Sequence, residues 1–354
     1  MTGMPVFSCF TIELILDVGD EMIEIDGSYG EGGGAILRVA TALAAFTGRS
    51  VHIGNIRANR PQKGLMAQHL HAVKAVSQLS QARVEGLEIG SEKIKFHPQK
   101  LTGKDITVDI KTAGSISLVL QAVMILAVGV DKPFQVTVRG GTDVRWSPLL
   151  DYLKNVTLPI LGLMGYQAHL ELKRRGYYPR GGGLVNLEIN PPFPLQGLKL
   201  KKLQVKHIRG VSHATRLPEH VAQRQADKAR EILTQRGYDV DIQVEVNQDA
   251  LGSGSGIVLW TEGQGRVGGS GLGERGKRAE KVGQEAAQEL LFHLEKGAPL
   301  DRYLSDQIIP YLALAGDSRV KVAQITPHTL TNIHVAEKIT GVRFQVEDEL
   351  ITVD

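Results

Sequence analysis

Cysteine is almost missing from this chain of 354 residues, because Cys9 is the only one. A single cysteine excludes an internal disulfide and any metal site built from several cysteines. Chains without disulfides are typical of reducing compartments. We therefore expect the protein to be cytoplasmic.

Long apolar runs and a strong net charge are also missing. The most apolar segment, Ile116 to Val130, is too short to span a bilayer and contains Gln121. The run from Met4 to Val18 includes acidic residues and lacks the basic start of a signal peptide, so we expect no membrane partner. The formal net charge is only +3, so any nucleic-acid surface must be a local basic patch.

What the sequence does contain is a repeated order of predicted elements. Periodicity predicts strand, helix, strand, helix and two strands, and this order returns after about 80 residues. The first set covers 22–26, 34–47, 51–56, 64–80, 83–86 and 92–96. The second covers 105–110, 115–129, 134–139, 147–164, 166–173 and 183–189. A third set covers 301–315, 319–325, 332–340, 342–347 and 350–353.

The prolines of Asn190-Pro191-Pro192-Phe193-Pro194 interrupt this order. The next segment has a different order of predicted elements. It contains predicted strands at 198–208, 238–245 and 256–262, helices at 218–236 and 279–296, and a glycine-rich loop at 263–276. We therefore predict an α/β (α+β) fold with three βαβαββ-type repeats in a large domain, 22–190 and 298–354. A smaller α/β domain is inserted at 191–297, and residues 1–21 form an N-terminal extension.

The glycine-rich segment from Asp26 to Arg38 is the first candidate for chemistry. Its glycines lie between a predicted strand and a helix, where they permit positive φ angles and leave N–H groups free for an anion. Glu31 would repel phosphate unless Mg²⁺ or Mn²⁺ bridged the two. Arg38, about one turn into the helix, can reach the same ligand. The alternative is a tight turn in which Glu31 is only a charge at a helix N-terminus.

Two further groups of polar residues are candidates for ligand contacts. Gln121 is the one polar residue in an otherwise apolar predicted helix, where it either forms a stabilising hydrogen bond or contacts a ligand. The second group contains arginines, which suit phosphate, and its alternative is a solvated basic turn. Its members cluster around one strand-to-helix connection: Arg57, Arg60, Lys63, Gln68 and His69.

Two more glycine-rich segments need an interpretation. Residues 271–277 fit G-x-G-x-x-G, but the preceding strand ends too early, and Arg278 stands where a P-loop needs Ser or Thr. We interpret this segment as a loop of the insert. Residues 175–185 carry three consecutive glycines into a strand. Their polar neighbours resemble a surface that binds phosphate and stacks on bases: Lys173, Arg174, Arg175, Tyr177, Tyr178 and Arg180.

Three segments together resemble the RNA 3′-terminal phosphate cyclase family: Asp26 to Arg38, Arg175 to Val185, and Thr326 to Asn332. The resemblance covers residues 22–354 and implies three βαβαββ-type repeats with an α/β insert. It also implies an ATP-dependent conversion of an RNA 3′-terminal phosphate to a 2′,3′-cyclic phosphate. The implied reaction passes through a covalent histidine–AMP intermediate and an RNA–adenylate, and it releases AMP and pyrophosphate.

The resemblance implies roles for individual residues. His328 matches the nucleophile that takes AMP, and Glu31 matches a ligand of Mg²⁺ or Mn²⁺. The residues implied for the RNA phosphate are Arg38, Arg57, Arg60, Gln68 and His69. Those implied for ATP are Gln121, Pro148, Tyr303, Leu304, Ser305, Asp306 and Gln307. The sequence departs from the family at Ala35, where glutamine is common.

Elementary chemistry suits His328 to this role, because a neutral imidazole is nucleophilic near its ordinary pKa of about 6.5. Attack on the α-phosphate of ATP gives a phosphoramidate. From the residues alone, the alternative is a structural histidine just before a helix capped by Thr331 or Asn332. Two alternative functions are a non-catalytic cyclase-like RNA-processing protein, which would lack the nucleophile, and an enolpyruvyl transferase, which needs neither this histidine nor the insert.

Overall fold

The computed structural model describes residues 22–191, 193 and 195–354. The predicted extension at 1–21, with Cys9, lies outside these residues. Within the described part of the chain, no helix is both long enough and apolar enough to cross a membrane.

Three four-stranded sheets share one topology, which confirms the predicted fold class. The first unit contains β1 (Ile23–Asp26), α2 (Gly34–Thr47), β2 (Val51–Gly54), α3 (Ala67–Ser80), β3 (Arg83–Glu85) and β4 (Ile94–His97), in the sheet order β1-β2-β4-β3. The second contains β5 (Ile106–Asp109), α4 (Ile116–Leu126), β6 (Phe134–Gly140), β7 (Ala168–Arg174) and β8 (Gly183–Ile189), in the order β5-β6-β8-β7. Its second helix is a continuous helical stretch of α5 (Leu150–Tyr152), a π-helical turn (Leu153–Thr157) and α6 (Leu158–Leu163).

The sheet of the third unit has the order β9-β14-β16-β15, with β9 (Lys199–Leu200), β14 (Ser318–Lys321), β15 (Phe344–Glu347) and β16 (Leu350–Val353). β9 pairs in parallel with β14, although the whole insert separates them in sequence. The insert therefore interrupts the third unit after its first strand. Two residues are too few to give a periodic signal, so the sequence analysis placed β9 inside the insert.

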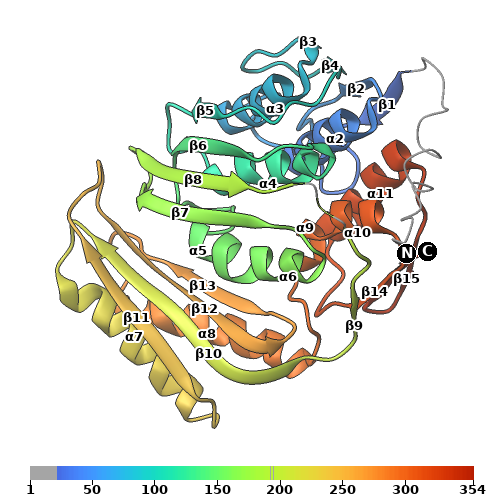
Figure 1. Ribbon diagram of the computed structural model, residues 1–354. Coiled ribbons are helices and arrows are strands. Elements are labelled where there is room, and N and C mark those ends of the chain that lie inside the picture. The colour runs from blue at the N-terminus through green and yellow to red at the C-terminus, as the bar shows by residue number, and fades with distance from the viewer. Residues whose placement is uncertain (1–21, 192, 194) are drawn as a thin grey trace, which may run out of the picture.

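The helices of the three units pack together at the centre, and the sheets lie outside them (Figure 1). α2 contacts α3, α4 and α11 (Pro327–Thr340). Almost every residue of α4 is buried, and Gln121 is the exception. This central packing brings the N-terminal part of the chain, through α2, against α11 near its end.

The first helix of the third unit is divided into α9 (Leu304–Gln307) and α10 (Ile309–Ala315). Pro310 has no N–H to donate to the carbonyl of Asp306 four residues earlier. Instead, Asn332 Nδ2 of α11 donates to that carbonyl at 2.9 Å. This hydrogen bond from Asn332 replaces the missing backbone bond and holds α9 against α11.

α11 begins five residues earlier than predicted. Thr326 is its N-cap, with Oγ1 accepting from Thr329 N at 3.1 Å, and Pro327 occupies the first turn. Proline favours this position because its missing N–H would be unsatisfied there in any case. The cap predicted at Thr331 or Asn332 is therefore wrong, and His328 lies within the first helical turn.

The insert is one more four-stranded sheet, in the order β11-β10-β12-β13. Its elements are β10 (Gln204–Thr215), α7 (Glu219–Thr234), β11 (Val240–Asn247), β12 (Gly254–Gln264), β13 (Gly268–Leu272) and α8 (Ala279–Lys296). α7 and α8 lie together on one face (Figure 1). The presence of β13 shows that the loop predicted at 263–276 is wrong. The strand contains glycine where it packs closely on α8, because a Cβ on Gly269 would lie 2.3 Å from the carbonyl oxygen of Ala286.

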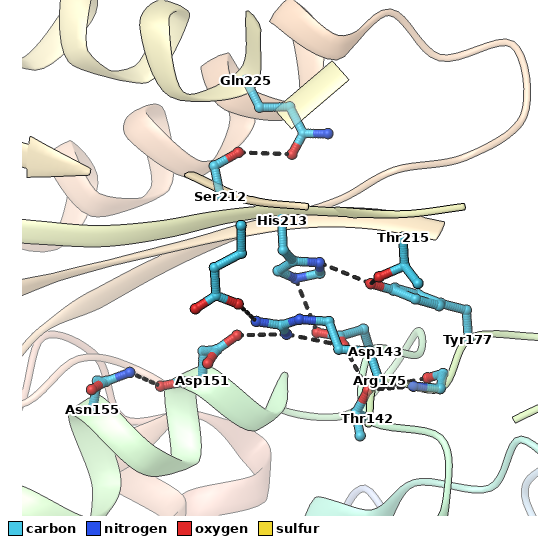
Figure 2. Close-up of polar contacts among 12 residues, drawn as sticks. Thr142, Asp143, Asp151, Asn155, Arg175, Tyr177, Ser212, His213, Thr215 and Gln225 are labelled. Carbon is cyan, nitrogen blue, oxygen red and sulfur yellow. Dashed lines mark hydrogen bonds and ion pairs between the residues drawn. The ribbon is translucent and has the colours of Figure 1, made fainter. Parts of the chain in front are cut away.

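A buried ionic network joins the other face of the insert to the second unit (Figure 2). Arg175 donates to Asp151 Oδ2 at 2.8 Å and to Glu245 Oε2 of β11 at 2.8 Å, and it lies 3.4 Å from Asp143 Oδ2. His213 Nε2 of β10 lies 3.3 Å from Asp143 Oδ1. Burial acts to raise the pKa of Asp143, but His213 and Arg175 outweigh it and hold that pKa well below its usual range.

This network removes two residues from the predicted surface that binds phosphate and stacks on bases. Arg175 and Tyr177 are both buried, and the Tyr177 hydroxyl lies 2.9 Å from His213 Nδ1. Donor atoms of Asp143, Asp151 and His213 lie within 4.8 Å of one another, a spacing that suits a metal ion. The Arg175 guanidinium already supplies the positive charge between the two aspartates. These residues hold the insert in place.

We predict that Arg175→Ala lowers the free energy of unfolding by about 3–5 kcal/mol, because it leaves buried carboxylates without a cation. Arg209→Ala is the matched control, since Arg209 also bridges two carboxylates but is exposed. Its loss of stability should be small, because water screens an exposed ion pair. Chemical denaturation of both variants measures the difference, and equal small losses would contradict a structural role for the network.

Candidate active site

The glycine-rich turn before α2 has the backbone that its sequence predicts. Gly30, Gly32 and Gly33 have φ angles of 54°, 62° and 87°. Gly33 is the N-cap of α2, and among the described residues no side chain accepts from the free N–H groups of this helix end. Unsatisfied N–H groups and the helix dipole together favour a bound anion.

The first turns of α11 lie against this turn. Glu31 N donates to Thr331 Oγ1 at 3.3 Å, and a Cβ on Gly30 would lie 2.5 Å from the same oxygen. Glycine at position 30 therefore allows the close approach. The contact brings the start of α11, with His328, beside the start of α2.

Two arginines from the connection after β2 complete this side of the site. Arg60 Nη2 donates to Glu31 Oε2 at 2.8 Å, and Gly33 leaves open the space beside the Arg60 guanidinium. Arg57 Nη1 donates to the carbonyl of Gly64 at 3.2 Å. Burial, and then the charge of Arg60, lowers the pKa of Arg57. Positive charge is thus concentrated around one carboxylate.

His69 is buried against the start of α2. Its Nδ1 accepts from Met66 N at 3.1 Å, so the proton of the neutral ring is on Nε2. A Cβ on Gly34 would lie 2.3 Å from that Nε2 and 2.9 Å from Arg38 Nη1. Burial, with the charges of Arg38 and Arg57, lowers the pKa of His69 to about 3. His69 is therefore a neutral N–H donor directed at the turn.

His328 is half-buried among three charged groups. Burial lowers its pKa, the charges of Arg38 and Arg60 lower it further, and Glu31 opposes them. Its Nδ1 is buried and has no hydrogen-bond partner among the described residues. A half-buried imidazole that is neutral at neutral pH has the properties of a nucleophile.

The helix α9 packs against α11 beside these groups. Burial lowers the pKa of Arg38 to about 10 and raises the pKa of Asp306 to about 7. The two groups lie close enough to attract each other, and this attraction opposes both shifts. Ser305 Oγ lies 2.9 Å from Thr329 Oγ1 in α11. Leu304 and Ser305 are both fully buried, so this arrangement of α9 exposes neither predicted ATP contact to a ligand.

The ends of α9 are held by residues of other units. Asp301, fully buried, accepts from Tyr303 N and Leu304 N at 2.9 Å and from Gly268 N of the insert at 2.8 Å. The Tyr303 hydroxyl donates to Glu289 Oε1 of α8 at 2.6 Å. Gln307 Oε1 accepts from Thr157 at 3.0 Å. The insert therefore positions the segment that carries five of the predicted ATP contacts.

The remaining predicted residues come from the second unit and α3. Gln68 Oε1 accepts from Ser115 N at 3.3 Å, and the carbonyl of Pro148 accepts from Ser117 Oγ at 2.7 Å. Gln121 is the partly exposed residue of α4, so its amide does not lie in the core as the hydrogen-bond alternative assumed.

Three of the residues that organise this site were missed by the sequence analysis. Asp301 and Thr331 act through long-range contacts that leave no local signal. Thr326, which sets the start of α11, could have been found from the Thr-Pro dipeptide, because proline is favoured directly after an N-cap.

Around one glycine-rich turn the fold thus gathers arginines, neutral histidines and the start of a helix, as expected of an anion-binding site. The sequence profile of the RNA 3′-terminal phosphate cyclase family matches residues 29–346. A protein named RNA 3′-terminal phosphate cyclase from Methanothermobacter thermautotrophicus is 55% identical, over 93% of this chain and 97% of its own. One of the same name from Methanopyrus kandleri is 50% identical, over 94% and 98%.

The chain belongs to the RNA 3′-terminal phosphate cyclase family and is an enzyme of that family, which confirms the resemblance. Among solved structures, the enolpyruvyl transferase NikO from Streptomyces tendae is 15% identical over 48% of this chain and 33% of its own, with a TM-score of 0.28. A likeness this weak carries no argument about function.

We predict that His328 titrates below its ordinary pKa of 6.5, the direction set by burial and two arginines. Glu31→Gln removes the carboxylate that favours the protonated ring, so it lowers this pKa further. Arg60→Gln removes an opposing cation and raises it. NMR titration of the ring protons, assigned with His328→Ala, measures all three values. A wild-type pKa at or above 6.5, or shifts of the opposite sign, would contradict this electrostatic account.

Proposed function

We propose that this enzyme uses ATP to convert an RNA 3′-terminal phosphate to a 2′,3′-cyclic phosphate, with His328 as the carrier of AMP. The names of its relatives support the overall reaction. The observation that supports the carrier is the position of the half-buried His328 ring in the first turn of α11, where its pKa is lowered and its neighbours are Glu31, Arg38 and Arg60.

In the proposed first step, a neutral imidazole nitrogen of His328 attacks the α-phosphorus of ATP. A P–N bond forms, and the P–O bond to pyrophosphate breaks. In the second step an oxygen of the RNA 3′-phosphate attacks the same phosphorus, which frees the histidine and gives RNA–adenylate. In the third, the vicinal 2′-oxygen attacks the RNA phosphorus, loses its proton and expels AMP.

The surrounding residues have distinct proposed roles. Arg38, Arg57 and Arg60, with the free N–H groups of α2, would neutralise the phosphates. His69 would donate from Nε2, because its Nδ1 is occupied by Met66 N, and Gln68 lies beside it on α3. ATP would lie against α9 and its flank (Tyr303, Leu304, Ser305, Asp306 and Gln307), Pro148 and Gln121. Ring closure needs little more than charge neutralisation, since effective molarities of intramolecular attack reach about 10⁵ M or more.

Glu31 could supply one ligand to a divalent cation, but not a complete site. It is a single partly exposed carboxylate already paired with Arg60, so it would share Mg²⁺ or Mn²⁺ with phosphate oxygens, as is usual for Mg²⁺. The cation would supply charge neutralisation at the triphosphate. Arg60 would then be released from Glu31 toward a phosphate.

The test is incubation with α-³²P-ATP and Mg²⁺ or Mn²⁺, followed by denaturing electrophoresis. Wild type should become labelled, and His328→Ala should lose the label while its thermal melting transition persists. His334→Ala is the matched control, since His334 is a half-buried histidine on the same helix, stacked on Tyr29 at 3.8 Å between ring centroids. Its label should remain. A labelled His328→Ala protein would place the nucleophile elsewhere, and an unlabelled wild type would favour the non-catalytic alternative.

A further inference from the structure

Two large aromatic side chains stand exposed on neighbouring loops outside the phosphate centre. Trp146 is 93% exposed and Tyr178 is 80% exposed. Their loops run side by side, because Asp143 forms a parallel bridge with Tyr177. A tryptophan and a tyrosine so fully in water forgo a large favourable burial, which a stacked ligand would recover.

Both aromatics are carried by constrained backbone. Trp146 has a φ angle of 61°, a conformation that bulky residues rarely adopt. The hydrogen bonds Ser147 Oγ to Val144 O, at 3.1 Å, and Ser117 Oγ to Pro148 O, at 2.7 Å, hold its loop. The turn at Tyr178 closes through Gly181 N to Tyr177 O at 2.7 Å. Constrained loops present the two rings to solvent with little entropy left to lose on binding.

Arginines accompany both rings in the sequence, with Arg145 next to Trp146 and Arg180 two residues after Tyr178. Arg145 Nε donates to Glu274 Oε1 at 3.1 Å, which brings the exposed Arg275 of the insert beside the Trp146 loop. Arg180, also exposed, donates to the carbonyl of Leu251 at 2.9 Å rather than to a carboxylate. Two acids lie nearby: Glu274 is paired with Arg145, and the exposed Asp249 lies 3.9 Å from Arg174. Aromatic rings among arginines are typical of surfaces that bind single-stranded nucleic acid.

A short chain of contacts connects these rings to the phosphate centre. Gln68, next to His69, accepts from Ser115 N, and Ser115 forms a bridge with Gly141 at the start of the Trp146 loop. The Trp146 loop therefore begins beside residues that flank the phosphate centre.

We propose that Trp146 and Tyr178 form a stacking platform for the single-stranded RNA just upstream of the terminal phosphate. The proposal rests on the proposed function for the identity of the substrate. Stacking is tolerant of sequence, because every base has a π-face. The platform would therefore give affinity for long substrates of any sequence without changing the transfer of AMP to the protein.

The first test compares 3′-phosphorylated oligonucleotides of about 2 and about 12 nucleotides, which bracket a single-strand binding site. Trp146→Ala should lower kcat/KM about 10-fold for the long substrate, chiefly through KM, and leave the short one unchanged. Trp146→Phe should keep most of the activity, since it keeps a ring. Ile89→Ala is the control, because Ile89 is 62% exposed on the first unit. Equal losses on both lengths, or none on the long one, would overturn the proposal.

The second test separates this proposal from the proposed function. Fluorescence anisotropy with a labelled 12-mer that ends in a 3′-hydroxyl, without ATP, measures binding alone; we expect Trp146→Ala and Tyr178→Ala each to weaken it about 10-fold. Unchanged binding, with a change in oligomeric state by sedimentation, would instead make the surface a protein interface. Loss of self-labelling with ATP in Trp146→Ala would assign the ring to the nucleotide site. Either result would overturn the platform, whether or not wild type cyclises RNA.

Discussion

The contact between the glycine-rich turn and α11 is the constraint on which the candidate site depends. Glu31 N and Thr331 Oγ1 meet at 3.3 Å although 300 positions separate them in sequence, and only glycine fits at position 30 beside that oxygen. Glu31 and Arg60 belong to the first unit and His328 to the third, so without this contact they would lie apart. The central packing of α2 on α11 makes them one group.

Charge and burial then give the two histidines of this group different properties. Both pKa values are lowered by burial and by arginines, so both rings are neutral at neutral pH. His69 uses Nδ1 to accept from the backbone, whereas the Nδ1 of His328 stays unpartnered among the described residues. The same electrostatic environment thus accommodates a hydrogen-bond donor for phosphate and, in our proposal, a nucleophile toward phosphorus.

Much of the fold could be predicted because helices such as α2 and α4 carry local apolar periodicity. The sequence pattern merged β9 with the start of β10 in one predicted strand of the insert, and it missed β13, whose glycines reflect close contact with α8. Arg175 was misinterpreted for a similar reason: an arginine in a glycine-rich motif suits phosphate or carboxylate equally, and only the fold shows Asp143 and Asp151 around it. The residues alone pointed to Glu31, Arg38 and the basic group around Arg57, and the family resemblance added His328 and the residues of α9. Only the structure shows how they are grouped.

The central claim is that AMP is transferred to His328, and mass spectrometry of the labelled peptide tests it most directly. Wild-type protein is incubated with ATP and Mg²⁺, digested under mildly alkaline conditions that preserve a phosphoramidate, and fragmented. The account predicts AMP on the peptide that begins the α11 helix, attached to His328 and lost on mild acid treatment. AMP attached to another residue, such as a lysine or His69, would contradict it.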